Sequence, residues 1–157
     1  YSLKLNSFVM KNFISIVLGG EWDYRTYNSW EKVIEEIYLI NDNTKIVFIG
    51  SSNAIEIAEK LTKKFDNKPI INYVAKFTFS QTAEIIRRAN VQLCCDGGLM
   101  HAGNAVETSI IPLFAHLTPQ MQLTDAIEAF PLFDKQNVNN IEVKSIIEKY
   151  KIYLEQK

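Results

Sequence analysis

Four residues in the middle of the sequence, Asp96, Gly97, Gly98 and His101, have the types and spacing of a ligand-binding loop. They follow a short apolar run and begin a segment that is typical of a helix. In a parallel sheet, ligands collect where strands end and helices begin. Glycines let backbone amides approach a ligand closely, and the partial positive charge at a helix start favours a phosphate group. We therefore predict that this loop binds an anionic ligand.

Two roles are open for each polar side chain of this loop. Asp96 is suited to accept hydrogen bonds from a sugar or ribose hydroxyl, or to cap the following helix. His101 is suited to donate to a phosphate oxygen, or to hold the Asp96 loop as a structural residue. The spacing of the two side chains across a turn is poor for ligands of one metal ion, so we predict no metal site.

Glycines also end two other apolar runs that are typical of buried strands. The run 13–18 stops at Gly19 and Gly20, and the run 45–49 stops at Gly50. In a parallel sheet, these glycines would share one edge with the Asp96 loop. Glycine also ends strands for purely conformational reasons, but glycines at three strand ends favour an elongated ligand that carries phosphates. The sequence contains neither the dinucleotide-binding fingerprint nor a P-loop.

Charged and nucleophilic residues elsewhere do not complete a catalytic set. Arg25, in the loop after the first strand, is suited either to reach a diphosphate or to remain a solvated charge. His116, after the last apolar run, is expected to be an exposed loop residue. Cys94 and Cys95 lie inside an apolar run without CxxC spacing, which favours two core residues in a reduced, cytoplasmic setting. Because there is also no GxSxG motif and no convincing pair of carboxylates, we predict a binding site without catalytic residues.

The composition is that of a single globular domain. The 157 residues are 47% hydrophobic and 22% charged, with a formal net charge of -1. This balance gives no electrostatic bias toward nucleic acid, which we do not expect as a partner. No apolar run approaches the roughly 20 residues of a membrane span, and no secretory signal is evident. The chain begins at Tyr1 rather than at Met, which suggests that a segment lies upstream.

Apolar β-prone runs alternate with amphipathic segments along the chain. Ser29, a residue among 51–53, and Ser80 are the expected helix caps, Ser80 in an imperfect capping box with Glu84. The alternation predicts an α/β fold, a Rossmann-like parallel sheet with helices on both faces and right-handed crossovers. Residues 1–12 are expected to be a linker or a leading strand. Strands are predicted over 13–18, 45–49, 69–73, 91–95 and 110–114. Helices are predicted over 30–40, 99–106 and 141–154. Two further helices are predicted, one that begins within 51–53 and ends at about residue 65, and one that begins at residue 80.

The segment from Asp96 to Ala102, which reads DGGLMHA, resembles the hallmark of glycosyltransferase family 9. These proteins are the lipopolysaccharide heptosyltransferases and their relatives. The strand and the Thr118-Pro119 loop that follow fit the same pattern, as does the strand–glycine–helix unit from Lys45 to Glu56. Family members have two Rossmann-like domains in the GT-B arrangement. This chain, from about Phe13 to Asp125, resembles the C-terminal domain, which binds the donor.

The resemblance implies a role for each residue of the predicted site. The general base, an aspartate, and the acceptor contacts belong to the N-terminal domain, which this chain lacks, so no catalytic residue is expected here. Neither a protein-held metal nor another cofactor is expected. The implied donor-binding residues are Gly97 and Gly98 for the diphosphate, Asp96 for the donor sugar, His101 as support for the loop, Arg25 in place of a phosphate-binding lysine, and the neighbouring Gly19, Gly20 and Gly50.

The function implied is transfer of a sugar with inversion, from ADP-heptose or a similar nucleotide sugar, to the lipopolysaccharide core or another surface glycan. The lipid-linked or oligosaccharide acceptor would contact the N-terminal domain, in the cytoplasm at the inner membrane of a bacterium. The 157-residue chain alone is expected to be inactive. Two alternatives are a sugar-nucleotide epimerase of GT-B shape, which needs acid–base carboxylates in the cleft, and a degenerate, non-catalytic binding domain.

Several positions depart from the family pattern. Gly97 replaces the usual threonine, so a hydroxyl contact to phosphate is lost. Tyr27 and Asn28 replace a tryptophan and a proline. The acidic residue expected near the ribose has no clear match, because Ala54 falls at about that position and Glu56 lies two residues further on. The resemblance therefore does not fix the identity of the donor.

Overall fold

The computed structural model of the protein describes residues 12–123 and 128–157, and it shows one sheet of six parallel strands. The strand order is β3-β2-β1-β4-β5-β6. The order reverses between β1 and β4, and such a switch point is where open α/β sheets bind ligands. The strands are β1 Phe13–Val17, β2 Lys45–Ile49, β3 Ile70–Asn72, β4 Val91–Cys95, β5 Ser109–Ala115 and β6 Leu132–Asp134.

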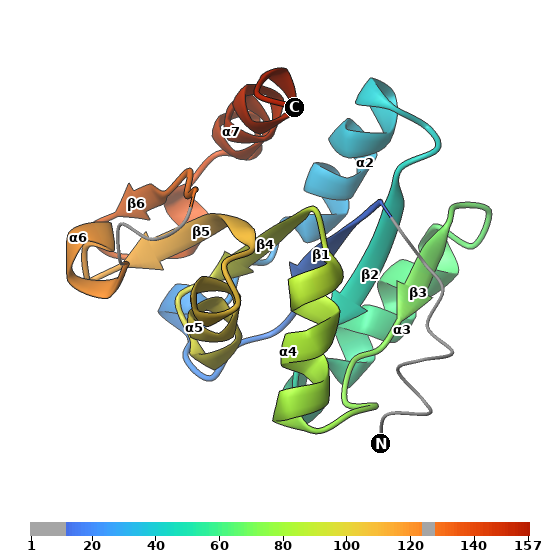
Figure 1. Cartoon of the computed structure of the whole chain (residues 1–157), viewed down its shortest axis with the longest axis horizontal. Helices are drawn as coiled ribbons and strands as arrows, with labels where there is room; N and C mark the ends of the chain where they lie inside the picture. Colours follow the sequence, from blue (N-terminus) through green and yellow to red (C-terminus); the bar gives the residue numbers. More distant parts are fainter. Residues whose placement is uncertain (1–11, 124–127) are drawn as a thin grey trace.

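Helices cover both faces of the sheet (Figure 1). One face carries α2 Trp30–Ile40, α3 Ile55–Lys64 and α7 Val143–Glu155, whose apolar side chains form one buried cluster. The other face carries α4 Phe79–Arg88 and α5 Gly98–Ala105. The predicted fold class is therefore confirmed. Shorter pieces are η1 Asp23–Arg25, η2 Ser52–Ala54, α6 Pro119–Gln122 and η3 Val138–Asn140.

The core follows from the spacing of apolar residues. Trp30, Ile34 and Ile37 recur at helical intervals on α2 and are buried against the sheet, which is the pattern of an amphipathic helix. All of β4 is buried, because parallel strands are covered on both faces and therefore read as continuous apolar runs. For the same reason β2 and β4 have the predicted bounds, and β5 extends its predicted run by one residue at each end.

The predicted cap of α4 is wrong. The helix begins at Phe79, and Thr78, not Ser80, is its N-cap. The Thr78 hydroxyl accepts from the Gln81 amide at 3.2 Å, and the Gln81 side chain accepts from the Thr78 amide at 3.0 Å. This is a complete capping box, since Gln81 stands at the third helical position after Thr78. Glu84 instead accepts from the guanidinium of Arg87 at 2.8 Å.

Other boundaries differ by a turn or less. Ser29 stands at the N-cap of α2 as predicted, but its side chain makes no capping hydrogen bond, and residues 52–54 form η2 before α3 begins. The strand β6 is missed, because it has only 3 residues and is incompletely buried. The helix α7 begins at Val143 rather than 141, because Ile141 still closes η3. Residues 1–11 of the predicted linker or leading strand lie outside the described residues.

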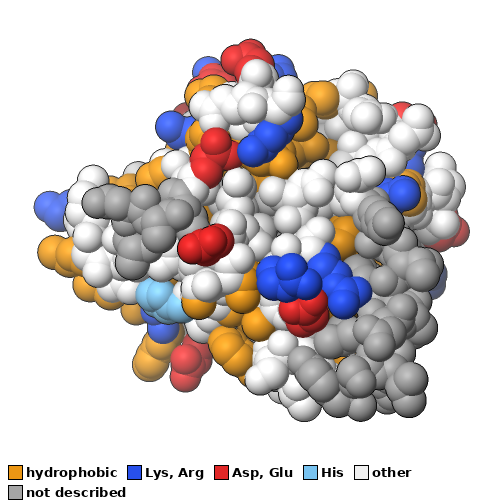
Figure 2. All heavy atoms as spheres, in the orientation of Figure 1, with side chains coloured by type: hydrophobic (Ala, Val, Ile, Leu, Met, Phe, Trp, Pro, Cys, Tyr) orange, Lys and Arg blue, Asp and Glu red, His pale blue; other side chains and the backbone are white. Residues whose placement is uncertain are grey.

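None of the helices in the described ranges combines the length and the apolar character needed to cross a bilayer. On the face covered by α4 and α5, acidic and basic side chains are interspersed among polar and apolar ones (Figure 2). Such a mixed surface has no large single-sign field that would steer a polyanion toward it.

Candidate functional site

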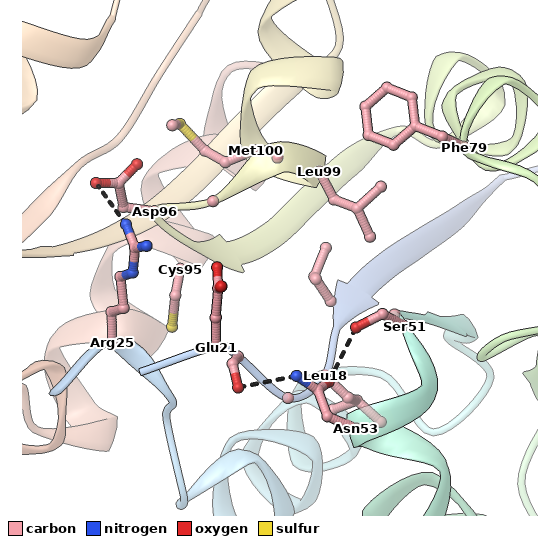
Figure 3. Close-up of a pocket in the computed structure, with 16 residues that line it drawn as sticks. Leu18, Glu21, Arg25, Ser51, Asn53, Phe79, Cys95, Asp96, Leu99 and Met100 are labelled. Atoms are coloured by element: carbon pink, nitrogen blue, oxygen red, sulfur yellow. Dashed lines mark hydrogen bonds and ion pairs between the residues drawn. The ribbon is translucent and has the colours of Figure 1, made fainter. Parts of the chain in front are cut away.

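A cavity of about 400 Å³ lies at the carboxyl edge of the sheet, where β1, β2 and β4 end (Figure 3). The loops after all three strands line it, as the glycine pattern predicted. Of the predicted donor-binding residues, the structure places seven on its wall: Gly19, Gly20, Arg25, Gly50, Asp96, Gly97 and Gly98. His101 is not among the lining residues, and its side chain is half exposed on α5 beside the loop.

Asp96 is the buried charge of the site, with only 4% of its side chain exposed. One carboxylate oxygen lies 3.8 Å from an Arg25 Nη, and the other lies 3.8 Å from Nε2 of His101. A buried carboxylate needs such partners because burial removes its hydration. At 3.8 Å neither contact is a hydrogen bond, so the Arg25 guanidinium keeps donors that a ligand can use. His101 thus lies beside Asp96, and the loop-supporting role that the resemblance implied for it stays a prediction.

The cap role considered for Asp96 is not the one observed. Gly97 occupies the N-cap of α5, and its backbone is extended, with φ of 170°. The Asp96 amide donates to the Leu113 carbonyl of β5 at 3.0 Å, which anchors the start of the loop. The Asp96 carboxylate is therefore held beside the first turn of α5 and at the wall of the cavity.

Gly97 and Gly98 leave open space in front of α5. A Cβ atom built at Gly97 has no heavy atom within 4 Å, and one at Gly98 meets only Phe79 Cε2, at 3.7 Å. Packing inside the described chain therefore does not require glycine at either position. What these glycines provide is access to the first turn of α5, where free backbone amides and the helix dipole favour an anion.

The loops after β1 and β2 form a rigid opposite wall. Asn53 Nδ2 donates to the Gly20 carbonyl at 3.0 Å, and the Ser51 hydroxyl donates to Asn53 Oδ1 at 3.0 Å. Gly19 has φ of +76°, and a Cβ there would lie 2.8 Å from Cβ of Ala54. These contacts fix the main chain of both loops against each other, so this wall is shaped before a ligand arrives.

Among the lining residues that the sequence analysis did not predict, three stand out. Glu21 follows Gly20 directly, Asn53 ties the two loops, and Phe79 is 59% exposed at the start of α4. Phe79 could have been predicted from the capping-box spacing of Thr78 and Gln81. That spacing makes Phe79 the first residue of α4, at the same edge of the sheet as the glycine loops. Glu21 could have been found from its place beside Gly20.

The residues considered for the missing acidic position do not reach this cavity. Ala54 is fully buried, and Glu56 lines a neighbouring cavity of about 430 Å³ on the other side of the loop after β1. His116, expected as an exposed loop residue, is exposed but also structural. Its ring stacks on Tyr24 with centroids 3.9 Å apart, and its Nε2 lies 2.9 Å from the Gln136 carbonyl.

The cysteines are core residues, as predicted. Both are buried and free, and burial raises the pKa of the Cys95 thiol to about 12. A thiol that is protonated at neutral pH is neither a nucleophile nor a metal ligand. Over residues 12–123 and 128–157, no three side chains of the His, Cys, Asp or Glu types gather as metal ligands would.

This sheet order, with its switch point between β1 and β4 and a glycine loop at that point, is the order of a Rossmann-like domain. The sequence model of glycosyltransferase family 9 (heptosyltransferase) matches residues 2–151. The chain therefore belongs to glycosyltransferase family 9. No curated protein sequence matches it significantly.

Solved structures with the same fold include a family 9 glycosyltransferase and two heptosyltransferases. A family 9 glycosyltransferase from Veillonella parvula matches with a TM-score of 0.80 and 17% identity, over 99% of this chain and 49% of that one. The E. coli ADP-heptose heptosyltransferase II matches with a TM-score of 0.76 and 17% identity, over 99% of this chain and 51% of that one. The structure of E. coli heptosyltransferase WaaC with ADP matches with a TM-score of 0.74 and 14% identity, over 96% of this chain and 46% of that one. The chain thus spans about half the length of these structures and is similar to one half of a GT-B glycosyltransferase.

Proposed function

We propose that this chain is the donor-binding half of an inverting glycosyltransferase that uses a nucleotide diphosphate sugar. The open face of α5 carries the proposal. Gly97 and Gly98 expose the first turn of the helix to a cavity of about 400 Å³, and Arg25 stands at the same wall. Backbone amides with a guanidinium are the groups that hold a diphosphate.

The chemistry supplied by this chain is binding and charge stabilisation. When the bond between the sugar and the diphosphate breaks, negative charge grows on the leaving phosphate. The amides of Gly97 and Gly98 and the guanidinium of Arg25 would stabilise that charge, and fixed donors cost no reorganisation during the step. Asp96, fixed by burial and by its contacts with Arg25 and His101, would orient Arg25 and accept from a donor hydroxyl.

The finer identity of the reaction is inferred from relatives. The WaaC structures are described with ADP and with ADP-2-deoxy-2-fluoro heptose, which supports ADP-heptose or a similar nucleotide sugar as the donor here. We propose that the acceptor, a lipid-linked or oligosaccharide glycan, and the general base contact the other half of the enzyme. We also propose that the enzyme acts in the cytoplasm, at the inner membrane, and that this half alone transfers no sugar.

Calorimetric titration with ADP, UDP, GDP and CMP tests the donor site. We expect saturable binding of one of the nucleoside diphosphates. Arg25→Ala should weaken it by about tenfold or more, because charge-assisted hydrogen bonds to phosphate are lost. Asp96→Asn should weaken it less, because the amide keeps the shape but no longer orients the guanidinium.

The matched control is Lys151→Ala, which removes an exposed cation from α7, a helix that does not line the cavity. It should leave the affinity unchanged. Equal losses in Arg25→Ala and Lys151→Ala would show only a general charge effect and would contradict the assignment of Arg25. If neither this chain nor a longer protein that contains it binds any of the nucleotides, the donor-site proposal is wrong.

A further inference from the structure

The charges on the cavity wall are unusual for a diphosphate site. Among the described residues that line the cavity, the charged side chains are Arg25, Asp96 and Glu21. The first two face each other at 3.8 Å and so offset each other. No Lys, Arg or His of the described chain forms an ion pair with Glu21, which leaves its carboxylate as the uncompensated charge of the wall.

The Glu21 side chain reaches into the cavity from the loop after β1. It lies between Cys95 and Asn53, and its carboxylate end is turned toward the side of the cavity where Asp96 and Met100 lie (Figure 3). Its main chain follows Gly20, whose carbonyl accepts from Asn53 at 3.0 Å. That bond ties the backbone directly before Glu21 to the loop after β2, so the Glu21 main chain is held at the cavity, and its exposed side chain belongs to the lining.

A carboxylate at this place treats two ligands differently. It accepts hydrogen bonds and donates none, so it can bind sugar hydroxyls but only repels phosphate oxygens. In a nucleotide sugar both phosphates are esterified, whereas in a free nucleoside diphosphate the terminal phosphate carries up to about one more negative charge near neutral pH. Glu21 therefore disfavours the free diphosphate more than the sugar-bearing one.

We propose that Glu21 sets the preference of this cavity for the nucleotide sugar over the nucleoside diphosphate that remains after transfer. This inference rests on the proposed donor-binding function and extends it to the step that follows the transfer. When the sugar leaves, the terminal phosphate gains charge while the Glu21 carboxylate stays in place. Repulsion between them then speeds release of the product and lowers product inhibition.

Glu21→Gln tests this selectivity, because the amide keeps the size of the side chain and removes its charge. We would titrate the original chain and the variant with two pairs of probes, ADP with ADP-glucose and UDP with UDP-glucose. For the pair that binds, the variant should bind the free diphosphate about three- to tenfold more tightly, as expected from removing one repulsive charge. Its affinity for the nucleotide sugar should change by less than about twofold, because the relieved repulsion is smaller and a hydroxyl acceptor is weakened.

Glu56→Gln is the matched control, since it makes the same change in the neighbouring cavity. It should move neither affinity. The gain in Glu21→Gln should also shrink as sodium chloride is raised, because salt screens a repulsion between charges. Thermal unfolding of each variant shows whether the fold is kept.

The two proposals fail in different ways. If the original chain binds a pair of probes but Glu21→Gln changes both affinities equally, lowers both, or changes neither, the selectivity role is overturned and the donor site stands. If neither this chain nor a longer protein that contains it binds any nucleoside diphosphate or nucleotide sugar, with or without Glu21→Gln, the donor site and the role of Glu21 fail together.

Discussion

The loops after β1 and β2 differ from the loop after β4, although all three place glycine at one edge of the sheet. A Cβ at Gly50 would lie 2.7 Å from the Leu18 carbonyl, and one at Gly20 would lie 2.3 Å from the Thr26 hydroxyl. A Cβ at Gly97 would meet nothing within 4 Å. The first loops therefore need glycine in order to fold, whereas the fold leaves the position of Gly97 free. Packing within the described chain therefore explains the first glycines and leaves room for a side chain at position 97.

The largest expected effect is the loss of stability in Gly50→Ala. Gly50 has φ of +156°, and the added methyl group would press on a backbone carbonyl that cannot move aside. We expect the free energy of unfolding to fall by about 3 kcal/mol, the cost of a strained backbone together with a steric clash. Urea unfolding followed by circular dichroism measures it. A loss below about 0.5 kcal/mol would remove the distinction between the loops.

A smaller effect on stability is expected directly behind the open loop. Gly103 of α5 faces Gln92 of β4, and a Cβ there would lie 2.0 Å from Gln92 Oε1. Gln92 is fully buried, and its Nε2 donates to the Leu99 carbonyl at 2.9 Å, so the amide cannot swing away. Gly103→Ala should therefore cost about 1–2 kcal/mol, although alanine normally stabilises a helix by about 1 kcal/mol over glycine.

A double-mutant cycle separates this clash from other causes. In a Gln92→Ala background the obstructing amide is gone, so Gly103→Ala should stabilise the chain through helix propensity. The sign of its effect should reverse between the two backgrounds. If Gly103→Ala destabilised the chain equally in both backgrounds, crowding by the Gln92 side chain would not be the reason for glycine at this position.

Gly97→Thr should leave stability within about 0.5 kcal/mol, because the side chain enters open space. It restores the hydroxyl that family members usually carry at this position. We expect the affinity for the nucleoside diphosphate to rise by about threefold, the value of one modest hydrogen bond. Gly97→Val is the control, since it has the same shape without the hydroxyl and should not tighten binding. A similar gain in both variants would assign the effect to packing.

The sequence was sufficient for the framework of the site. Buried parallel strands such as β4 are recognisable because their apolar runs are unbroken, and glycine marks where they end. The alternation of strands and helices then placed Gly19, Gly50 and Asp96 on one edge without any knowledge of long-range contacts. That is why the glycine loops, Arg25 and Asp96 could be assembled in advance.

What the sequence could not supply depends on contacts between distant residues. The choice of Thr78 over Ser80 as the cap depends on the hydrogen bonds made with Gln81, not on residue type alone. The position of Glu21 in the cavity depends on the bond between Asn53 and Gly20, which lie in different loops. The stacking of His116 on Tyr24 likewise joins segments that only the folded chain brings together.

The smallest expected effect concerns Cys95, at the base of the open loop. Burial raises the pKa of its thiol to about 12, so at pH 8 the thiol is almost entirely protonated and unreactive. Iodoacetamide at pH 8 should therefore leave Cys95 unmodified in the folded chain and label it in urea, with mass spectrometry as the readout. Rapid labelling of Cys95 in the folded chain would show that the end of β4 opens often, and that Gly97 is accessible because the loop is mobile. Protection of Cys95 is the result expected for a strand end that stays closed, which is the arrangement that a preformed anion site requires.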